Sequence, residues 1–210
     1  VIDHHRAGAT YIQNAALAFI EPYASSVSEL MTEIIQELTE PADLLRCEAE
    51  AMLAGIVLDT KSFTIRTGER TFDAAAYLRR AGADTTEVKK LLQTDMNDTV
   101  SRYKIMQGAE LYRNVAIAAP EEPQSRIVAA QAADELLNIS GVEASIVIAP
   151  NEKGGIAVSA RSIGELNVQL IMEMLGGGGN RSAAAAQFEN TDVHTVVQRV
   201  YAAIDDYLGG

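Results

Sequence analysis

The stretch "ASIVIAPNEKGGIAVSARS", residues 144–162, is the part of the sequence that determines the fold class. Both of its ends are rich in β-branched and small apolar side chains, as β-strands commonly are. A glycine pair, Gly154 and Gly155, lies between these ends and favours a turn. The pattern therefore predicts a β-hairpin with strands near residues 144–150 and 156–162.

Helical patterns surround this hairpin. Apolar residues with a helical period predict amphipathic helices in segments 125–139 and 192–208, and a further helix that ends at glycines 176–179. Residues 115–120 ("VAIAAP") predict a strand, and the alanine-rich residues 181–188 ("RSAAAAQF") predict a short helix. Strands and helices alternate, so the second half of the chain is expected to be an α/β domain.

The first half of the chain is dominated by helix-forming residues. Ser26 and Glu29 have the spacing of a capping box and predict a helix that runs to about Glu40. Residues 44–63 predict a buried helix that ends near Asp59. The opening "VID" is typical of the carboxyl end of a strand, which is where α/β sheets carry their sites. The whole chain is therefore expected to be an α/β protein with two domains.

Composition limits the function classes. The 210 residues are 48% hydrophobic, which is enough for a substantial core. The net charge of −12 and the absence of basic runs argue against binding of duplex nucleic acid. A small anionic substrate would need metal ions or helix N-termini to offset that charge. Cys47 is the single cysteine, which excludes an intrachain disulfide and fits a reducing compartment.

Asp3, His4 and His5 form the first candidate site. Neutral imidazole is a good ligand for Mn, Fe, Co or Zn, and a carboxylate commonly fixes its orientation. At a strand end, this triplet can place a metal ligand and its orienting carboxylate together. The alternative is a polar loop with an incidental histidine pair, and the three residues alone do not decide between the two.

Asp59 is the second candidate, because it ends the otherwise apolar run "MLAGIVLD". A carboxylate there is costly to bury unless a positive group meets it. A divalent metal, a helix cap or Lys61 would each meet this need. Read in isolation, a cap is the more frequent arrangement.

The glycines 176–179 are the third candidate. They remove every Cβ from a turn, so the backbone can approach a ligand closely. The helix expected after them would direct its N–H groups at that turn and form an anion site. Arg161, at the end of the hairpin strand, could supply a bidentate phosphate contact. The alternative is a glycine C-cap and an exposed surface arginine.

Several stretches together resemble a known family. They are "VIDHHR", "EPYASSVSELMTEI", "AEAMLAGIVLDTKSFTIRTGERTFDAAAYLRRAGAD" and "VSARSIGELNVQLIMEMLGGGGNRSAAAAQ". In this order they resemble the C-terminal part of the catalytic module of GdpP-type cyclic di-AMP phosphodiesterases, in the DHH phosphoesterase superfamily. The resemblance implies a truncated DHH-type domain with a parallel sheet over residues 1–98, a linker helix over 99–113, and a smaller α/β DHH-associated, substrate-binding domain over 114–210.

This resemblance also implies a chemistry and a set of site residues. Two Mn²⁺ ions would activate a water and polarise the phosphodiester. His4 and Asp59 would bind metal, Asp3 would orient the metal-binding histidine, and His5 would face the substrate phosphate, so that these four residues are catalytic. The remaining substrate contacts would come from the second domain, which would close over the first: Ser159, Arg161, Asn167, Gly176, Gly177, Gly178, Gly179 and Asn180.

Two features depart from the family pattern. The chain starts after two upstream ligand motifs of the family, so it is expected to be a fragment that is inactive alone, with a first domain that is rearranged, oligomeric or dependent on a partner chain. Asn180 occupies a position where the family usually has histidine, and asparagine cannot become cationic. The expected function is hydrolysis of cyclic di-AMP to linear pApA by the complete protein. The alternatives are a non-catalytic nucleotide-binding module and a nanoRNase-like or pAp phosphatase-like enzyme.

The resemblance implies partners as well. They are a cyclic dinucleotide substrate, a second copy of the protein in a homodimer, and upstream membrane and sensor domains. Duplex nucleic acid is not expected as a partner. The parent protein would then be anchored in the cell membrane, with this part on the cytoplasmic face.

Overall fold

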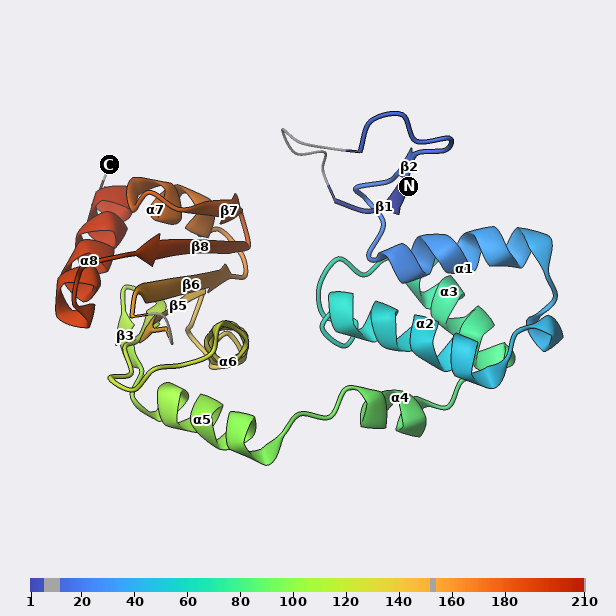
Figure 1. Cartoon of the computed structure of the whole chain (residues 1–210), viewed down its shortest axis with the longest axis horizontal. Coiled ribbons are helices and arrows are strands. Elements are labelled where there is room, and N and C mark those ends of the chain that lie inside the picture. Colours follow the sequence, from blue (N-terminus) through green and yellow to red (C-terminus); the bar gives the residue numbers. More distant parts are fainter. Residues whose placement is uncertain (6–11, 152–153, 210) are drawn as a thin grey trace. The chain divides into compact units, whose positions relative to one another are not determined.

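The computed structural model describes residues 1–5, 12–151 and 154–209. The chain divides into two compact units, Val1–Gln93 and Thr94–Gly210 (Figure 1). Both units combine helices with strands, which confirms the predicted α/β class. None of the helices in the described ranges is long and apolar enough to cross a membrane.

The first unit has two short parallel strands and a group of helices. Strand β1 (Ile2–Asp3) pairs in parallel with β2 (Phe19–Ile20). The helices are α1 (Val27–Leu38), the 3-10 turn η1 (Pro41–Asp43), α2 (Arg46–Asp59), α3 (Glu69–Arg80) and α4 (Thr85–Leu91). Their core is made of buried side chains from α2, α3 and α4, including Leu53, Ile56, Leu78 and Val88.

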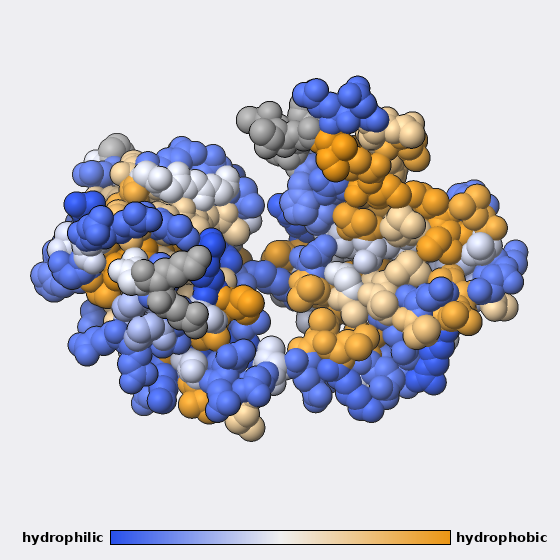
Figure 2. Space-filling model, in the orientation of Figure 1, coloured by the Kyte–Doolittle hydropathy of each residue, from blue (hydrophilic) through white to orange (hydrophobic). Residues whose placement is uncertain are grey.

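Apolar side chains also lie on the surface of this unit. Figure 2 shows them gathered on its visible face. Phe19 and Ile20 of β2 are exposed, and so are Leu58 of α2 and Phe72 of α3. Large exposed apolar patches usually mark interaction surfaces. That the unit is rearranged, oligomeric or dependent on a partner chain stays a prediction.

Helix α1 begins where its cap residues predict, but the capping box is only half made. The Glu29 backbone N–H donates to Ser26 Oγ at 3.0 Å. The Glu29 carboxylate is buried and accepts from Ser25 Oγ at 2.5 Å and from Thr71 Oγ1 at 2.6 Å. Because Thr71 belongs to α3, this buried carboxylate ties the start of α1 to the start of α3.

We expect Glu29→Ala to lower the free energy of unfolding of this unit by about 3 kcal/mol, because the buried hydroxyls of Ser25 and Thr71 would lose the acceptor to which they donate. Glu33 is the matched control on the same helix. It pairs with Arg70 at 2.7 and 2.8 Å at the surface, and this hydrogen bonding raises the pKa of Arg70. Glu33→Ala should cost less than about 1 kcal/mol. Equal losses for the two variants in chemical denaturation would refute the structural role assigned to Glu29.

The second unit is a six-stranded sheet between two layers of helices. Its elements are α5 (Met96–Gln107), β3 (Glu110–Tyr112), β4 (Val115–Ala118), α6 (Arg126–Leu136), β5 (Ala144–Pro150), β6 (Ile156–Ser162), α7 (Val168–Met174), β7 (Gly178–Asn180), β8 (Ala183–Phe188) and α8 (Val193–Gly209). The strand order is β3-β4-β5-β6-β8-β7, with β4 and β5 parallel and the other neighbours antiparallel. Helices α7 and α8 pack on one face, and α5 and α6 pack on the other.

The predicted hairpin is present as β5 and β6. Their antiparallel pairing runs from Ala144 opposite Ser162 to Pro150 opposite Ile156. In the turn, Asn151 N donates to the Gly155 carbonyl at 2.8 Å. The turn residues 152–153 lie outside the described residues. Residues 99–113, expected to be a linker helix, lie in the second unit and include most of α5 and all of strand β3.

The predicted helix over residues 181–188 is wrong, because this segment contains strand β8. Burial alternates along it: Ala184 and Ala186 face the core under α7 and α8, whereas Ala185 is exposed. Pairing with β6 on one side and β7 on the other outweighs the intrinsic helix propensity of alanine. Alanine also leaves room for the glycine-rich β7 to approach closely.

Candidate functional site

The structure brings His4 and Asp59 together within the first unit. His4 directly follows β1, and Asp59 is the last residue of α2. The Nε2 atom of His4 lies 3.7 Å from Oδ2 of Asp59. The His4 side chain is 6% exposed and that of Asp59 is 41% exposed, so the carboxylate has an open side.

This pair is suited to share a cation. The 3.7 Å separation is too long for a hydrogen bond, yet two ligands each about 2 Å from one ion can be this far apart. Imidazole with carboxylate suits Mn, Fe or Zn. His4 Nδ1 is buried without a hydrogen-bond partner among the described residues. Among the residues that the structure describes, no group of three or more His, Cys, Asp or Glu could hold an ion.

Asp3 contacts His5. Its Oδ1 lies 2.7 Å from His5 Nδ1 and accepts from the His5 backbone N–H at 3.1 Å. The hydrogen bond with the His5 side chain holds the pKa of the Asp3 carboxyl below its ordinary value. The resemblance implies that Asp3 orients the metal-binding histidine, whereas here it orients the neighbouring ring. The His5 side chain is 71% exposed.

In the second unit, Ser159 and Arg161 lie on the same face of β6, because residues two apart in a strand point the same way. Arg161 Nε is 3.0 Å from Oδ1 of Asp134 on α6. This pairing fixes the guanidinium against the sheet. The sequence analysis did not predict a role for Asp134, because its local pattern carries no sign that it pairs with Arg161 on strand β6.

Asn167 and Asn180 both use their side-chain oxygens locally. Asn167 caps α7 by accepting from Gln169 N at 3.1 Å. Asn180 accepts from Ser182 N, Ser182 Oγ and Ala183 N at 3.0, 3.1 and 3.0 Å, which closes the turn between β7 and β8. For both residues the amide nitrogen is the atom that could donate to a substrate, and such contacts stay a prediction.

Close strand packing explains two glycines of the run, Gly177 and Gly179. A Cβ on Gly177 would lie 2.1 Å from the Ala185 carbonyl oxygen, and one on Gly179 would lie 2.4 Å from that of Ala183. Gly176 and Gly179 also have φ of +78° and +152°. The expected anion site at a helix N-terminus is wrong, because a strand follows these glycines. Substrate contacts by Gly176–Gly179 stay a prediction.

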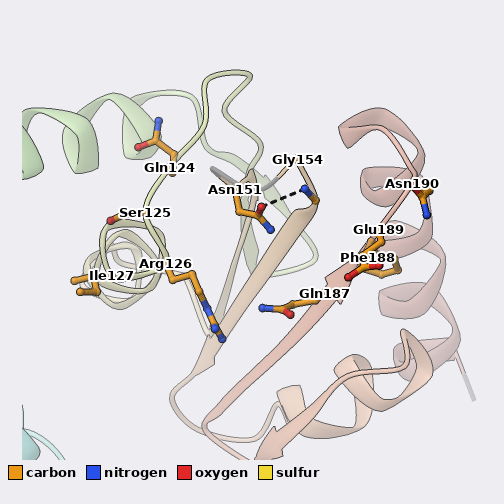
Figure 3. A pocket seen from close by; sticks show the side chains of 11 residues that line it. Gln124, Ser125, Arg126, Ile127, Asn151, Gly154, Gln187, Phe188, Glu189 and Asn190 are labelled. Atoms are coloured by element: carbon orange, nitrogen blue, oxygen red, sulfur yellow. Dashed lines mark hydrogen bonds between the residues drawn. The ribbon is translucent and has the colours of Figure 1, made fainter.

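A cavity of about 780 Å³ lies elsewhere in the second unit. Figure 3 shows the side chains of Arg126 and Gln187, two of its lining residues, extending toward one another. Its lining is Gln124, Ser125, Arg126, Ile127, Asn151, Gly154, Gly155, Gln187, Phe188, Glu189 and Asn190. None of the predicted substrate residues lines it. It lies at the Ile156–Phe188 end of the β6–β8 pair, whereas Arg161 pairs with Ala183 at the opposite end.

The chain is similar to proteins of known family. Residues 114–210 match the DHHA1 domain. The whole chain is 49% identical to "Cyclic-di-AMP phosphodiesterase GdpP" of Geobacillus thermodenitrificans and 44% identical to "Cyclic-di-AMP phosphodiesterase PdeA" of Listeria monocytogenes. It spans 32% of the length of each, about a third.

A solved structure has the same fold. An exopolyphosphatase-related protein from Bacteroides fragilis matches with a TM-score of 0.85 at 21% identity, over 98% of this chain and 63% of that one. This agreement covers both units and supports the DHH-type fold. The chain is thus similar along its whole length to the GdpP and PdeA cyclic-di-AMP phosphodiesterases, and its residues 114–210 match the DHHA1 domain.

Proposed function

We propose that the complete protein containing this chain is a metal-dependent phosphodiesterase that hydrolyses cyclic di-AMP to linear pApA. The names of the GdpP and PdeA relatives support the reaction. One observation in the chain itself carries the proposal: His4 Nε2 and Asp59 Oδ2 converge to 3.7 Å. The carboxylate is open on one side, as a metal ligand needs to be.

In this proposal, His4 and Asp59 would hold the Mn²⁺ ions. Bound there, the ions would polarise the phosphodiester and lower the pKa of a water. His4 is buried, so its ring has little freedom to turn away from the carboxylate. The chain contributes these two donors, and the complete protein supplies the others.

Asp3 and His5 act on the substrate side. The Asp3 carboxylate fixes the His5 ring through Nδ1, which leaves Nε2 directed away from Asp3. When the ring carries both protons, Nε2–H can donate to a phosphate oxygen. A charge-assisted bond of this kind is stronger than one between neutral groups.

The second unit contributes substrate contacts. Arg161, held by Asp134, would donate to a phosphate group, and Ser159 lies on the same strand face to donate a hydroxyl hydrogen bond. Asn167, the glycines 176–179 and Asn180 would complete the contacts. We further propose that the parent is a membrane-anchored homodimer with this region in the cytoplasm.

We expect the complete protein to convert cyclic di-AMP to pApA in the presence of Mn²⁺, and a chelator to abolish the conversion because no protein group replaces the ions. Chromatography of the products measures both. The isolated chain should show little turnover, since its described residues contain no group of three or more donors that could hold an ion. Turnover unaffected by metal removal would contradict the proposal.

Asn180 gives one reason to test other substrates. An uncharged side chain in this position changes the contact with phosphate and could favour pAp or short oligonucleotides. A competition assay, in which the complete protein hydrolyses cyclic di-AMP in the presence of each of these compounds, measures which substrate it prefers. Faster hydrolysis of pAp or of dinucleotides would favour the nanoRNase-like alternative. Binding without hydrolysis of any of them would favour a non-catalytic module.

A further inference from the structure

Directly after Asp59, the backbone makes a turn that residues with a Cβ rarely adopt. Lys61, Ser62 and Phe63 have φ of +48°, +59° and +63°, so three consecutive residues lie in the left-handed region. Residues other than glycine normally visit this region singly, because Cβ then crowds the following carbonyl oxygen. Strained backbone persists only where surrounding contacts impose it, and it concentrates at functional sites.

Thr60 makes several of the contacts that hold this turn, beside the hydrogen bond from Ser62 N to the Val57 carbonyl at 2.8 Å. Its side chain is fully buried, and Oγ1 donates to the Ile56 carbonyl at 2.6 Å and accepts from Phe63 N at 3.0 Å. The Thr60 carbonyl accepts from Thr64 N at 2.9 Å and from Ile65 N at 3.0 Å. The hydroxyl therefore joins the last turn of α2 to the third residue of the left-handed turn.

The turn has a consequence for the Asp59 carboxylate. If α2 continued, residue 63 would follow Asp59 by four positions, and its side chain would lean back over the carboxylate. Instead, Phe63 stacks on Phe72 of α3, with ring centroids 5.5 Å apart and planes 14° apart. Asp59 thereby keeps an exposed side and faces His4.

We propose that Thr60 is a positioning residue, whose hydroxyl holds the left-handed turn and so keeps the Asp59 carboxylate open to the metal. This inference rests on the proposed metal role of Asp59. The effect of Thr60 on the turn itself does not depend on that role.

The test compares variants of the complete protein. Thr60→Val keeps the shape and removes the hydroxyl, so Mn²⁺ affinity by calorimetric titration should fall about 10-fold or more. Amide hydrogen exchange at Ser62 and Phe63 should accelerate, with or without metal. Thr60→Ser restores the hydroxyl and should bind Mn²⁺ nearly as the wild type does.

Thr39→Val is the matched control. Thr39 is the C-cap of α1, and its hydroxyl likewise donates to the carbonyl four residues earlier, at 3.1 Å. Because Thr39 caps a different helix, this variant should leave both Mn²⁺ affinity and exchange after Asp59 unchanged.

Two outcomes separate the inference from the proposed function. A wild type that binds no Mn²⁺ refutes the proposed function, whereas wild-type binding matched by Thr60→Val refutes only the role of Thr60. If Thr60→Val fails to fold, Phe72→Ala loosens the turn from the exposed side of the ring stack. That variant should also lose Mn²⁺ affinity, and unchanged affinity would overturn the inference.

Discussion

Asp59→Asn in the complete protein should reduce cyclic di-AMP hydrolysis by about three orders of magnitude, because the proposed metal ligand would lose the charge that holds the ions, and the ions would supply several kcal/mol of charge stabilisation. Asparagine keeps the size of the side chain and removes its charge. The neighbouring His4 would then lack the anionic partner that lies 3.7 Å away. Steady-state rates at saturating Mn²⁺ measure the loss.

Asp73→Asn is the matched control for this variant. Asp73 is an exposed carboxylate on α3 in the same unit, so its loss changes the net charge equally without touching the His4–Asp59 pair. Its rate should equal that of the wild type. If Asp59→Asn retained more than a tenth of wild-type activity, the proposed metal role of Asp59 would be contradicted.

Gly177→Ala should destabilise the second unit by about 3 kcal/mol, because overpacking against fixed backbone cannot be relieved by a rotamer change. Its Cβ would meet the Ala185 carbonyl oxygen at 2.1 Å and the Ala186 Cα and Cβ at 2.8 and 2.7 Å. Strand β7 would have to separate from β8. The midpoint of thermal unfolding should fall by about 10 °C or more.

Gly178→Ala is the control for the glycine run. A Cβ there meets nothing within 4 Å, and Gly178 has no positive φ. Circular dichroism should show little change in its unfolding midpoint. Equal behaviour of the two variants would mean that close strand packing does not explain this stretch.

Much of the fold could be predicted from local patterns. The β5–β6 hairpin follows from two β-branched runs around a glycine pair, and α2 follows from helix formers that end at Asp59. Strand β8 could not be predicted this way, because its alanines favour a helix in isolation. Its pairing with β6 and β7 is a tertiary property that a local pattern does not contain.

The individual residues of the candidate site could be predicted from the sequence, but their arrangement in space could not. The separate signals at His4 and Asp59 carry no information on distance, and only the fold brings the two side chains together. Asp3 binds the adjacent ring because the short link to His5 allows both backbone and side-chain hydrogen bonds. The turn after Asp59 has no glycine or asparagine signal, since the Thr60 hydroxyl and the stacking of Phe63 on Phe72 impose it.

The most direct test of this account is a crystal structure of the complete protein grown with Mn²⁺, with data collected to locate manganese by anomalous scattering. We expect an anomalous peak between His4 and Asp59, within about 2 Å of His4 Nε2 and of an Asp59 carboxylate oxygen. A manganese peak bound elsewhere, with His4 and Asp59 both outside its coordination sphere, would contradict the account.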